Sequence, residues 1–308
     1  MIKNTLEKIK NKTSSICRLD EPLKKHTTYR IGGPAELMIF PKNKVDLIKT
    51  IQIINENKIQ LTILGSGSNV LISDKGIKGA VISLKNSLKQ VKVNRNELYA
   101  ECGAMLGKIV KLAVKNNLIG LENLNGVPGT LGGALIMNAG AWGGEISENL
   151  SCVELINSKN ELKKIKKDEI NFSYRKSSFD NSDILLSAEF KLREAEKSII
   201  SENFLKAQSG RRNTQPLDKR SAGSLFKNPK NNSAGKLIDE AGLKGFVIGD
   251  AKISDKHANF FINNGDASSE DMLKLIKKAH STVKEKFSID LELEVKLMGF
   301  EESQIKGL

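Results

Sequence analysis

The chain has 308 residues, a length that favours two or three domains and excludes a miniature scaffold. Its 39% hydrophobic and 28% charged residues supply both packed cores and a polar surface, which argues against global disorder. The net charge of +13 favours anionic ligands, phosphate-bearing small molecules included, without selecting among them.

Several classes of protein fit the composition poorly. No apolar run approaches the ~18 residues of a membrane span, and the opening segment lacks the apolar region of a secretory signal, so we expect a cytoplasmic protein with no membrane partner. Aromatic residues are only 5% and the lysines are scattered, so we expect no nucleic-acid partner. The three cysteines and three histidines lie far apart without metal-ligand spacing, which predicts no metal site and no disulfide framework.

Periodicity predicts an α+β chain of three parts. The first part should contain helices over 2–9 and 45–57, the second with Val45, Ile48, Ile51 and Ile54 on its packed face, and strands over 35–40, 60–64 and 79–84. The second part should contain strands over 98–103, 151–156 and 184–192 and a helix over 105–117. A linking helix over 194–213 then precedes a third part, with helices over 234–242 and 268–287 and strands over 259–263 and 291–300. We therefore expect domains at 1–85, 86–195 and 205–300, with 301–308 returning to the first.

Glycine is concentrated in two segments that follow strand-like runs. Gly65-Ser66-Gly67-Ser68-Asn69 suits a pyrophosphate cradle of main-chain donors, although a tight turn is an equal alternative. Gly126 to Gly144 holds seven glycines in nineteen positions, which predicts a loop whose buried backbone lies against a large flat ligand; a packing role is the alternative. The first segment is neither a Walker loop nor a complete dinucleotide fingerprint, so a dinucleotide would need a different fold.

Six motifs in fixed order carry a resemblance that spans nearly the whole chain. They are TTYRIGGPAEL (27–37), ILGSGSNVLISD (63–74), LNGVPGTLGGALIMNAGAWGGE (124–145), FSYRKSSF (172–179), SAGSLFKNP (221–229) and LEVKLMG (293–299). With them the chain resembles the UDP-N-acetylenolpyruvoylglucosamine reductase family, in its shorter subclass without a tyrosine-bearing substrate loop.

The resemblance implies a flavoprotein of peptidoglycan precursor synthesis. It implies a vanillyl-alcohol-oxidase-like FAD fold of two subdomains plus a C-terminal α+β substrate-binding domain. The cofactor would be non-covalent FAD, NADPH would be the co-substrate, and the protein would be a monomer that acts on UDP-N-acetylglucosamine-enolpyruvate. The implied FAD-binding residues are Tyr29, Arg30, Gly65, Ser66, Gly67, Ser68, Asn69, Gly126, Pro128, Gly129, Thr130, Gly132, Gly133, Asn138, Gly140 and Ala141.

Three residues are candidates for the chemistry. Ser224 lacks a nucleophile elbow and a histidine partner, which disfavours covalent catalysis; the resemblance makes it the proton donor. Period-2 alternation predicts that Leu291, Leu293, Val295 and Leu297 share an apolar face and that Glu294 faces away from the core, and the resemblance makes Glu294 an acid or hydrogen-bond donor. The planar fork of Arg175 suits a carboxylate, and the resemblance makes it the group that polarises the substrate carboxylate.

Substrate-binding candidates are Tyr174, Lys227 and Asn228, with Arg211, Arg212 and His257 as weaker ones. Two other functions stay open at this point. One is a flavin oxidase of the same fold, and the other is a basic nucleotide- or RNA-binding protein that uses the glycine segments for phosphate alone.

Overall fold

The computed structural model describes residues 1–85, 87–180 and 182–308, which separate into two compact units. Unit 1 consists of Met1–Arg18, Leu37–Ser66 and Gly79–Gly210, and unit 2 of Leu19–Glu36, Gly67–Lys78 and Arg211–Leu308. The chain thus passes between the units several times. The predicted domain boundaries and the return of 301–308 to the first subdomain stay predictions.

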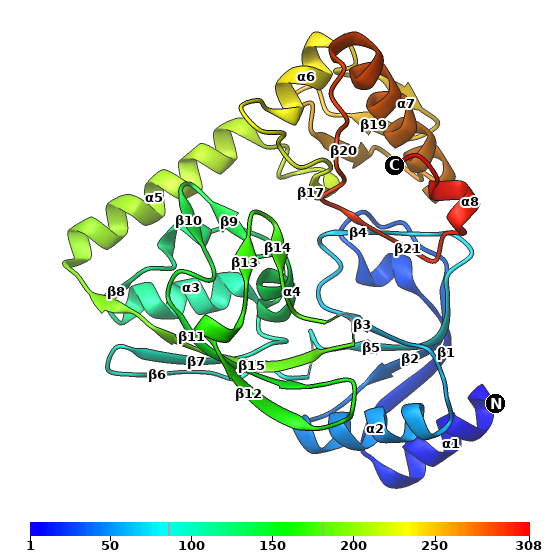
Figure 1. The fold of residues 1–308 in the computed structure, drawn as a ribbon, viewed down its shortest axis with the longest axis vertical. Coiled ribbons are helices and arrows are strands. Elements are labelled where there is room, and N and C mark those ends of the chain that lie inside the picture. Colours follow the sequence, from blue (N-terminus) through cyan, green and yellow to red (C-terminus); the bar gives the residue numbers. More distant parts are fainter. Residues whose placement is uncertain (86, 181) are drawn as a thin grey trace. The chain divides into compact units, whose positions relative to one another are not determined.

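Figure 1 shows the helices and strands, coloured along the chain from blue at the N-terminus to red at the C-terminus. In unit 1 they are α1 Ile2–Lys12, α2 Lys44–Glu56, β3 Leu61–Leu64, β6 Val91–Asn94, β7 Glu97–Glu101, α3 Leu106–Lys115, β8 Leu118–Ile119, α4 Leu131–Ile136, β9 Gly140–Ala141, β10 Gly144–Glu145, β11 Leu150–Ile156, β12 Leu162–Lys166, β13 Phe172–Ser173, β14 Lys176–Ser177, β15 Ile184–Lys191 and β16 Arg193–Glu194. In unit 2 they are β4 Val70–Ile72, β17 Arg220–Ser224, α6 Ala234–Glu240, β18 Val247–Ile248, β19 Ala251–Ile253, β20 Phe260–Asn263, α7 Ser269–Phe287, β21 Lys296–Met298 and α8 Glu302–Ile305. Those that continue from one unit into the other are β1 Ile16–Pro22, β2 Pro34–Phe40, β5 Ile77–Ser83 and α5 Lys197–Thr214.

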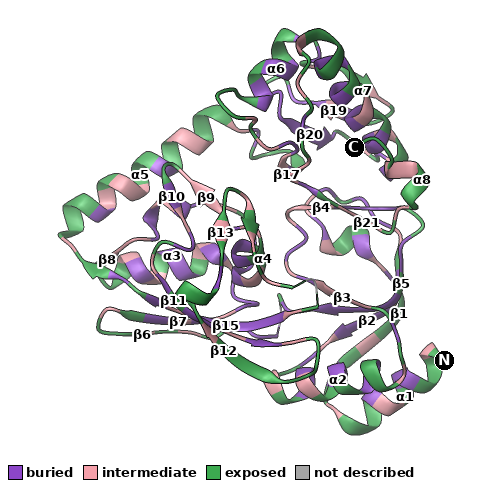
Figure 2. Ribbon diagram, viewed as in Figure 1, coloured by how far each residue is buried: buried purple, intermediate pink, exposed green. Residues whose placement is uncertain are grey.

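The largest sheet belongs to unit 1 and is antiparallel, with the strand order β12-β11-β15-β7-β6. Its central strand β15 is almost wholly buried, whereas its edge strand β12 is largely exposed (Figure 2). The amphipathic helix α3 buries Leu106, Ile109 and Val110 in the same core as this sheet. The predicted strands and helix of the second part are therefore confirmed, and β6 and β12 are strands that the pattern missed.

The helices α1 and α2 pack together in a second hydrophobic core of unit 1. Leu6 and Ile9 are buried, as their helical spacing predicts. The predicted packed face of α2 is wrong at Val45, which is 61% exposed, whereas Ile51 and Ile54 are buried as predicted. Leu47, outside the predicted face, is buried as well. Because apolar residues also stand side by side in this helix, at Leu47-Ile48 and Ile53-Ile54, periodicity alone did not fix its rotation.

The predicted loop over 126–144 is only partly a loop. It contains the short helix α4 and the pair β9–β10. Trp142 and Gly143, with φ of 52° and 82°, form the two-residue turn that joins those strands. The alternation of glycine with apolar residues masked these local elements.

Unit 2 has an antiparallel sheet in the order β17-β20-β19-β18, and α7 packs into the same core. The predicted strand over 291–300 is too long: regular pairing is confined to β21, which runs parallel to β4. The reason is local, because the N–H groups of Glu294 and Val295 both donate to the carbonyl of Leu225, at 2.8 and 3.3 Å. Two residues opposite one acceptor interrupt the ladder.

Candidate active site

The two glycine segments meet inside unit 1. A Cβ at Gly65 would lie 2.4 Å from Oγ1 of Thr130, whose residue is only 2% exposed. The end of β3 can therefore approach the start of α4 only if position 65 carries no side chain. The sequence predicted two separate glycine-rich features, and the fold joins them.

The second glycine segment is fixed to the connection between β7 and α3. The N–H of Leu106 donates to the carbonyl of Gly129, and the N–H of Gly132 donates to that of Cys102, both at 2.9 Å. Packing favours glycine at position 132, because a Cβ there would lie 3.2 Å from Cβ of Cys102. Gly133 is exposed and would meet only Oγ1 of Thr130, at 3.7 Å, so its backbone is open to a ligand.

Asn138 is fully buried, with a left-handed φ of 42°. Its Nδ2 donates to Oε2 of Glu145 at 2.6 Å and to the carbonyl of Ser173 at 3.1 Å. Within the described residues its buried Oδ1 has no hydrogen-bond partner. The amide nitrogen thus links the glycine segment to Ser173, while the side-chain oxygen makes no hydrogen bond within the described residues.

Arg175 lies in the turn between β13 and β14, with a φ of 55°. Its Nη2 donates to the carbonyl of Gly140 at 2.9 Å, and its Cζ lies 5.0 Å from the ring centre of Tyr174. The guanidinium is therefore held against the second glycine segment and beside a half-exposed aromatic ring.

The other end of the first glycine segment belongs to unit 2. Gly67 has a φ of 64°, a Cβ there would lie 2.2 Å from the carbonyl of His26, and its own carbonyl accepts from the N–H of Thr28 at 3.0 Å. Tyr29 is fully buried, and this burial raises the pKa of its phenol. Arg30 is exposed, with a φ of 58°.

Ser224 and Glu294 are brought together in unit 2, although 70 positions separate them in the chain. Ser224 ends β17 and follows Gly223, which has a φ of 79° and open space around it. Leu225, the next residue, accepts from the N–H of Glu294 at 2.8 Å. Nδ2 of Asn69 donates to the carbonyl of Glu294 at 3.0 Å, which fixes this segment on its second side.

Asn259 is a residue that the sequence reasoning missed. Its side chain accepts from the N–H of Phe226 at 3.0 Å and donates to the carbonyl of Phe226 at 2.8 Å. Its own carbonyl accepts from the N–H of Leu225 at 2.8 Å. An amide residue just before an apolar strand was the available signal. It holds the backbone that follows Ser224.

The predicted substrate-binding residues of unit 2 differ in what they do in the fold. Nζ of Lys227 forms an ion pair with Glu292, and Oδ1 of Asn228 accepts from the N–H of Ala234 at 3.0 Å. His257 accepts from the N–H of Asn259 through Nδ1 at 3.2 Å, and burial lowers the pKa of its imidazole. His257 is thus favoured in its neutral form.

Arg211 and Gln215 lie four residues apart where α5 ends. Nε of Arg211 and Oε1 of Gln215 are buried and, among the described residues, lack hydrogen-bond partners. Burial lowers the pKa of Arg211. Such orphaned groups fit a polar ligand. The neighbouring Arg212 is exposed, and its carbonyl accepts from Nζ of Lys256 at 2.7 Å.

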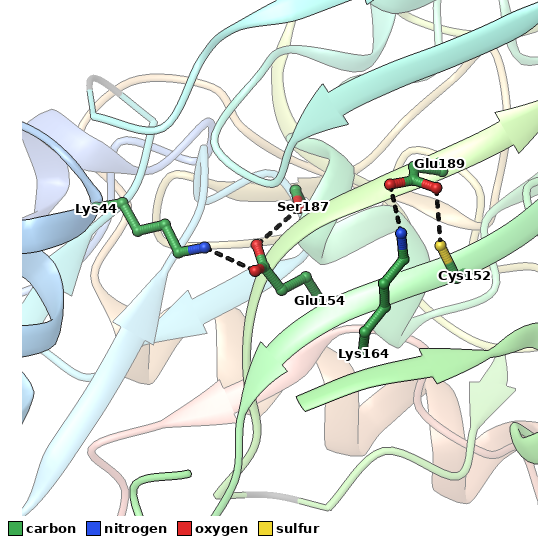
Figure 3. Close-up of polar contacts among 6 residues, drawn as sticks. All are labelled: Lys44, Cys152, Glu154, Lys164, Ser187 and Glu189. Atoms are coloured by element: carbon green, nitrogen blue, oxygen red, sulfur yellow. Dashed lines mark hydrogen bonds and ion pairs between the residues drawn. The ribbon is translucent and has the colours of Figure 1, made fainter. Parts of the chain in front are cut away.

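A separate polar cluster borders a cavity of about 280 Å³ on the large sheet of unit 1 (Figure 3). Lys44 pairs with Glu154 at 2.7 Å, and Lys164 pairs with Glu189 at 2.7 Å. Burial, followed by its hydrogen bond to Glu189, raises the pKa of the Cys152 thiol. These charges satisfy one another, and no cluster with metal-ligating potential occurs in 1–85, 87–180 or 182–308.

Comparison with known proteins decides the family. The C-terminal domain of UDP-N-acetylenolpyruvoylglucosamine reductase matches residues 215–298, and an FAD binding domain matches residues 35–166. The UDP-N-acetylenolpyruvoylglucosamine reductase of Caldanaerobacter subterraneus is 43% identical over 91% of this chain and 93% of its own length. The enzyme of Listeria monocytogenes is 42% identical over 92% and 95%.

This chain belongs to the UDP-N-acetylenolpyruvoylglucosamine reductase family. A solved reductase of that name from Thermus caldophilus agrees in fold, with a TM-score of 0.78 and 33% identity over 92% of this chain and 98% of that one. The predicted family and FAD fold are confirmed, whereas the roles of individual site residues stay predictions.

Proposed function

We propose that this chain reduces the enolpyruvyl group of UDP-N-acetylglucosamine-enolpyruvate to UDP-N-acetylmuramate in peptidoglycan precursor synthesis, with FAD as cofactor and NADPH as electron donor. One observation carries the proposal in a chain of this family. The two glycine segments approach each other closely at Gly65 and Thr130, and Arg175 is bonded to the same segment through Gly140.

The residues of the glycine segments fit FAD. The exposed backbone at Gly133 suits a ligand lying along the main chain, whereas glycine at positions 65 and 67 lets the first segment pack closely against Thr130 and His26. The FAD-binding residues named from the sequence would hold it, with the buried Tyr29 acting through its position in the core rather than through an exposed hydroxyl. When bound, FAD supplies the hydride that adds to the enolpyruvyl methylene carbon.

Arg175 would bind the substrate carboxylate and polarise it. Its guanidinium offers a planar fork of donors, and the bond to Gly140 holds this fork at the second glycine segment. Withdrawing electron density toward the carboxylate makes the methylene carbon a better acceptor of hydride. Loss of a preorganised donor of this kind costs about 10²–10³ in turnover.

Ser224 would deliver the proton that completes the reduction. Its O–H bond breaks as a C–H bond forms at the carbon beside the carboxylate, and solvent then returns a proton to the serine oxygen. Glu294, held beside this segment through Leu225, would donate a hydrogen bond or a proton to the enolised carboxylate. Tyr174, Lys227, Asn228, Arg211 and His257 would contact the UDP-sugar. The monomeric state and the cytoplasmic location stay predictions.

Ser224→Ala tests the proposal by separating the two half-reactions. NADPH should still bleach the bound flavin, whereas reoxidation by the enolpyruvyl substrate should slow by about 10²–10⁴ because the proton donor is lost. The matched control is Ser221→Ala in the same strand, which should leave both rates unchanged. Stopped-flow absorbance of the flavin measures both steps. Unchanged reoxidation in Ser224→Ala would remove this serine from the mechanism.

A further inference from the structure

The hairpin that carries Arg175 is joined to the second glycine segment by three hydrogen bonds. Oγ of Ser177 donates to the carbonyl of Ile136 at 2.8 Å. The carbonyl of Ser173 accepts from Asn138, and Arg175 donates to Gly140, as described above. The partners in the glycine segment are thus every second residue, 136, 138 and 140, and we call these three bonds the clamp.

The hairpin needs such support. β13 and β14 contain two residues each and, in the described part of the chain, pair only with one another. An isolated two-stranded hairpin is at best marginally stable in water, and this one also places a non-glycine residue, Arg175, in the left-handed region. The direction of the guanidinium therefore depends on bonds from outside the hairpin.

Two of the three bonds have clear second functions. Arg175 is itself the proposed substrate-binding residue, and Asn138 is among the proposed FAD-binding residues. Ser177 has neither role, is only partly buried, and has its hydroxyl committed to a backbone carbonyl of α4. Its hydrogen bond is consequently the part of the clamp that a substitution can remove without touching a proposed ligand contact.

We propose that Ser177 is a positioning residue for Arg175, and that the clamp makes the carboxylate-binding side chain part of the same rigid element as the flavin-binding segment. The proposal rests on the proposed role of Arg175. It implies that substrate and flavin are aligned by one continuous backbone structure, with Ser177 fixing the open end of the hairpin, where it pairs with Phe172.

The test compares Ser177→Ala with Ser173→Ala. Ser173 contributes its backbone carbonyl to the clamp, so removal of its exposed hydroxyl leaves the bond from Asn138 intact. Ser177→Ala should lower kcat/KM for the enolpyruvyl substrate about three- to tenfold, the amount expected for one neutral hydrogen bond, and leave flavin bleaching by NADPH unchanged. Ser177→Thr, which keeps a hydroxyl, should restore most of the loss.

Hydrogen exchange of the 172–177 peptide provides a second measurement that needs no turnover. Exchange should be faster in Ser177→Ala than in the wild type, Ser173→Ala or Ser177→Thr, both with and without FAD. Equal exchange in all four proteins, or equal slowing of both half-reactions in Ser177→Ala, would overturn the proposal. If the enolpyruvyl substrate fails to reoxidise even the wild-type flavin, the proposed function fails, while the exchange rates still decide whether Ser177 fixes the hairpin.

Discussion

At the scale of single residues, the site depends on positions where close packing allows only glycine. The contact between Gly65 and Thr130 shows why: a buried hydroxyl occupies the space that any Cβ at position 65 would need. Gly107, by contrast, lies in α3 with no heavy atom within 4 Å of an added Cβ. Packing thus requires glycine at position 65 but not at position 107.

Gly65→Ala should therefore destabilise the protein by about 1–3 kcal/mol, as overpacking of a filled interior does, and weaken flavin retention. Gly107→Ala, the control, should be neutral or stabilising by up to about 1 kcal/mol, because alanine is the better helix former. Thermal unfolding and flavin absorbance measure both effects. Adding Thr130→Ala removes the colliding oxygen and should recover stability relative to Gly65→Ala alone; no recovery would show that another contact limits position 65.

At the scale of elements, hydrogen bonds in the first turn of α7 fix where this helix begins. Oγ of Ser268 accepts from the N–H of Asp271 at 3.0 Å, and the carboxylate of Asp271 accepts in return from the N–H of Ser268 at 3.1 Å. Asp74 adds a second anchor by accepting from the N–H of Ser269 at 2.7 Å. This capping box explains why the start of the helix was predictable from adjacent residues alone.

Ser268→Ala should lower the free energy of unfolding by about 0.5–2 kcal/mol, since the first turn loses its side-chain acceptor. The matched control is Ser281→Ala on the exposed face of the same helix, which should change stability by less than about 0.5 kcal/mol. Urea denaturation measures both. A loss in Ser281→Ala as large as that in Ser268→Ala would contradict the assignment of the cap.

At the scale of the whole molecule, two properties bear on which ligands the protein binds: its net charge of +13 and its retention of flavin. Among the helices of the described residues, none combines the length and the apolar character needed to cross a membrane. The positive charge favours phosphate-bearing ligands in general, so it does not by itself separate a flavoprotein from a basic binding protein. Flavin retention does separate them.

The purified protein should be yellow, and removal of FAD should lower its melting temperature. Ligand at about 100 times its Kd stabilises the folded state by ~2.7 kcal/mol, which for a chain of this size corresponds to a shift of roughly 4 °C. Thermal scans of the apoprotein with and without added FAD measure the shift, and FMN, which lacks the adenosine half, is the control. A colourless protein with no shift and steep salt dependence of oligonucleotide binding would instead favour the nucleic-acid reading.

The sequence by itself determined the features that local chemistry controls. Helical spacing located α1, α3 and α7. Motif order indicated the family, and with it the FAD fold. These signals arise within a few neighbouring residues or from a pattern spread along the chain, and neither requires knowledge of packing.

Only the tertiary structure decided which distant residues act together. The bulge at Glu294 and Val295 arises from one carbonyl of Leu225, and the bonds of Asn259 and Ser177 reach backbone groups far away in the chain. Such contacts form only when packing of the core brings distant segments side by side. The spacing of residues along the sequence does not show which segments will meet. For the same physical reason, the sequence identified Arg175 as a candidate, while the fold revealed what holds it in place.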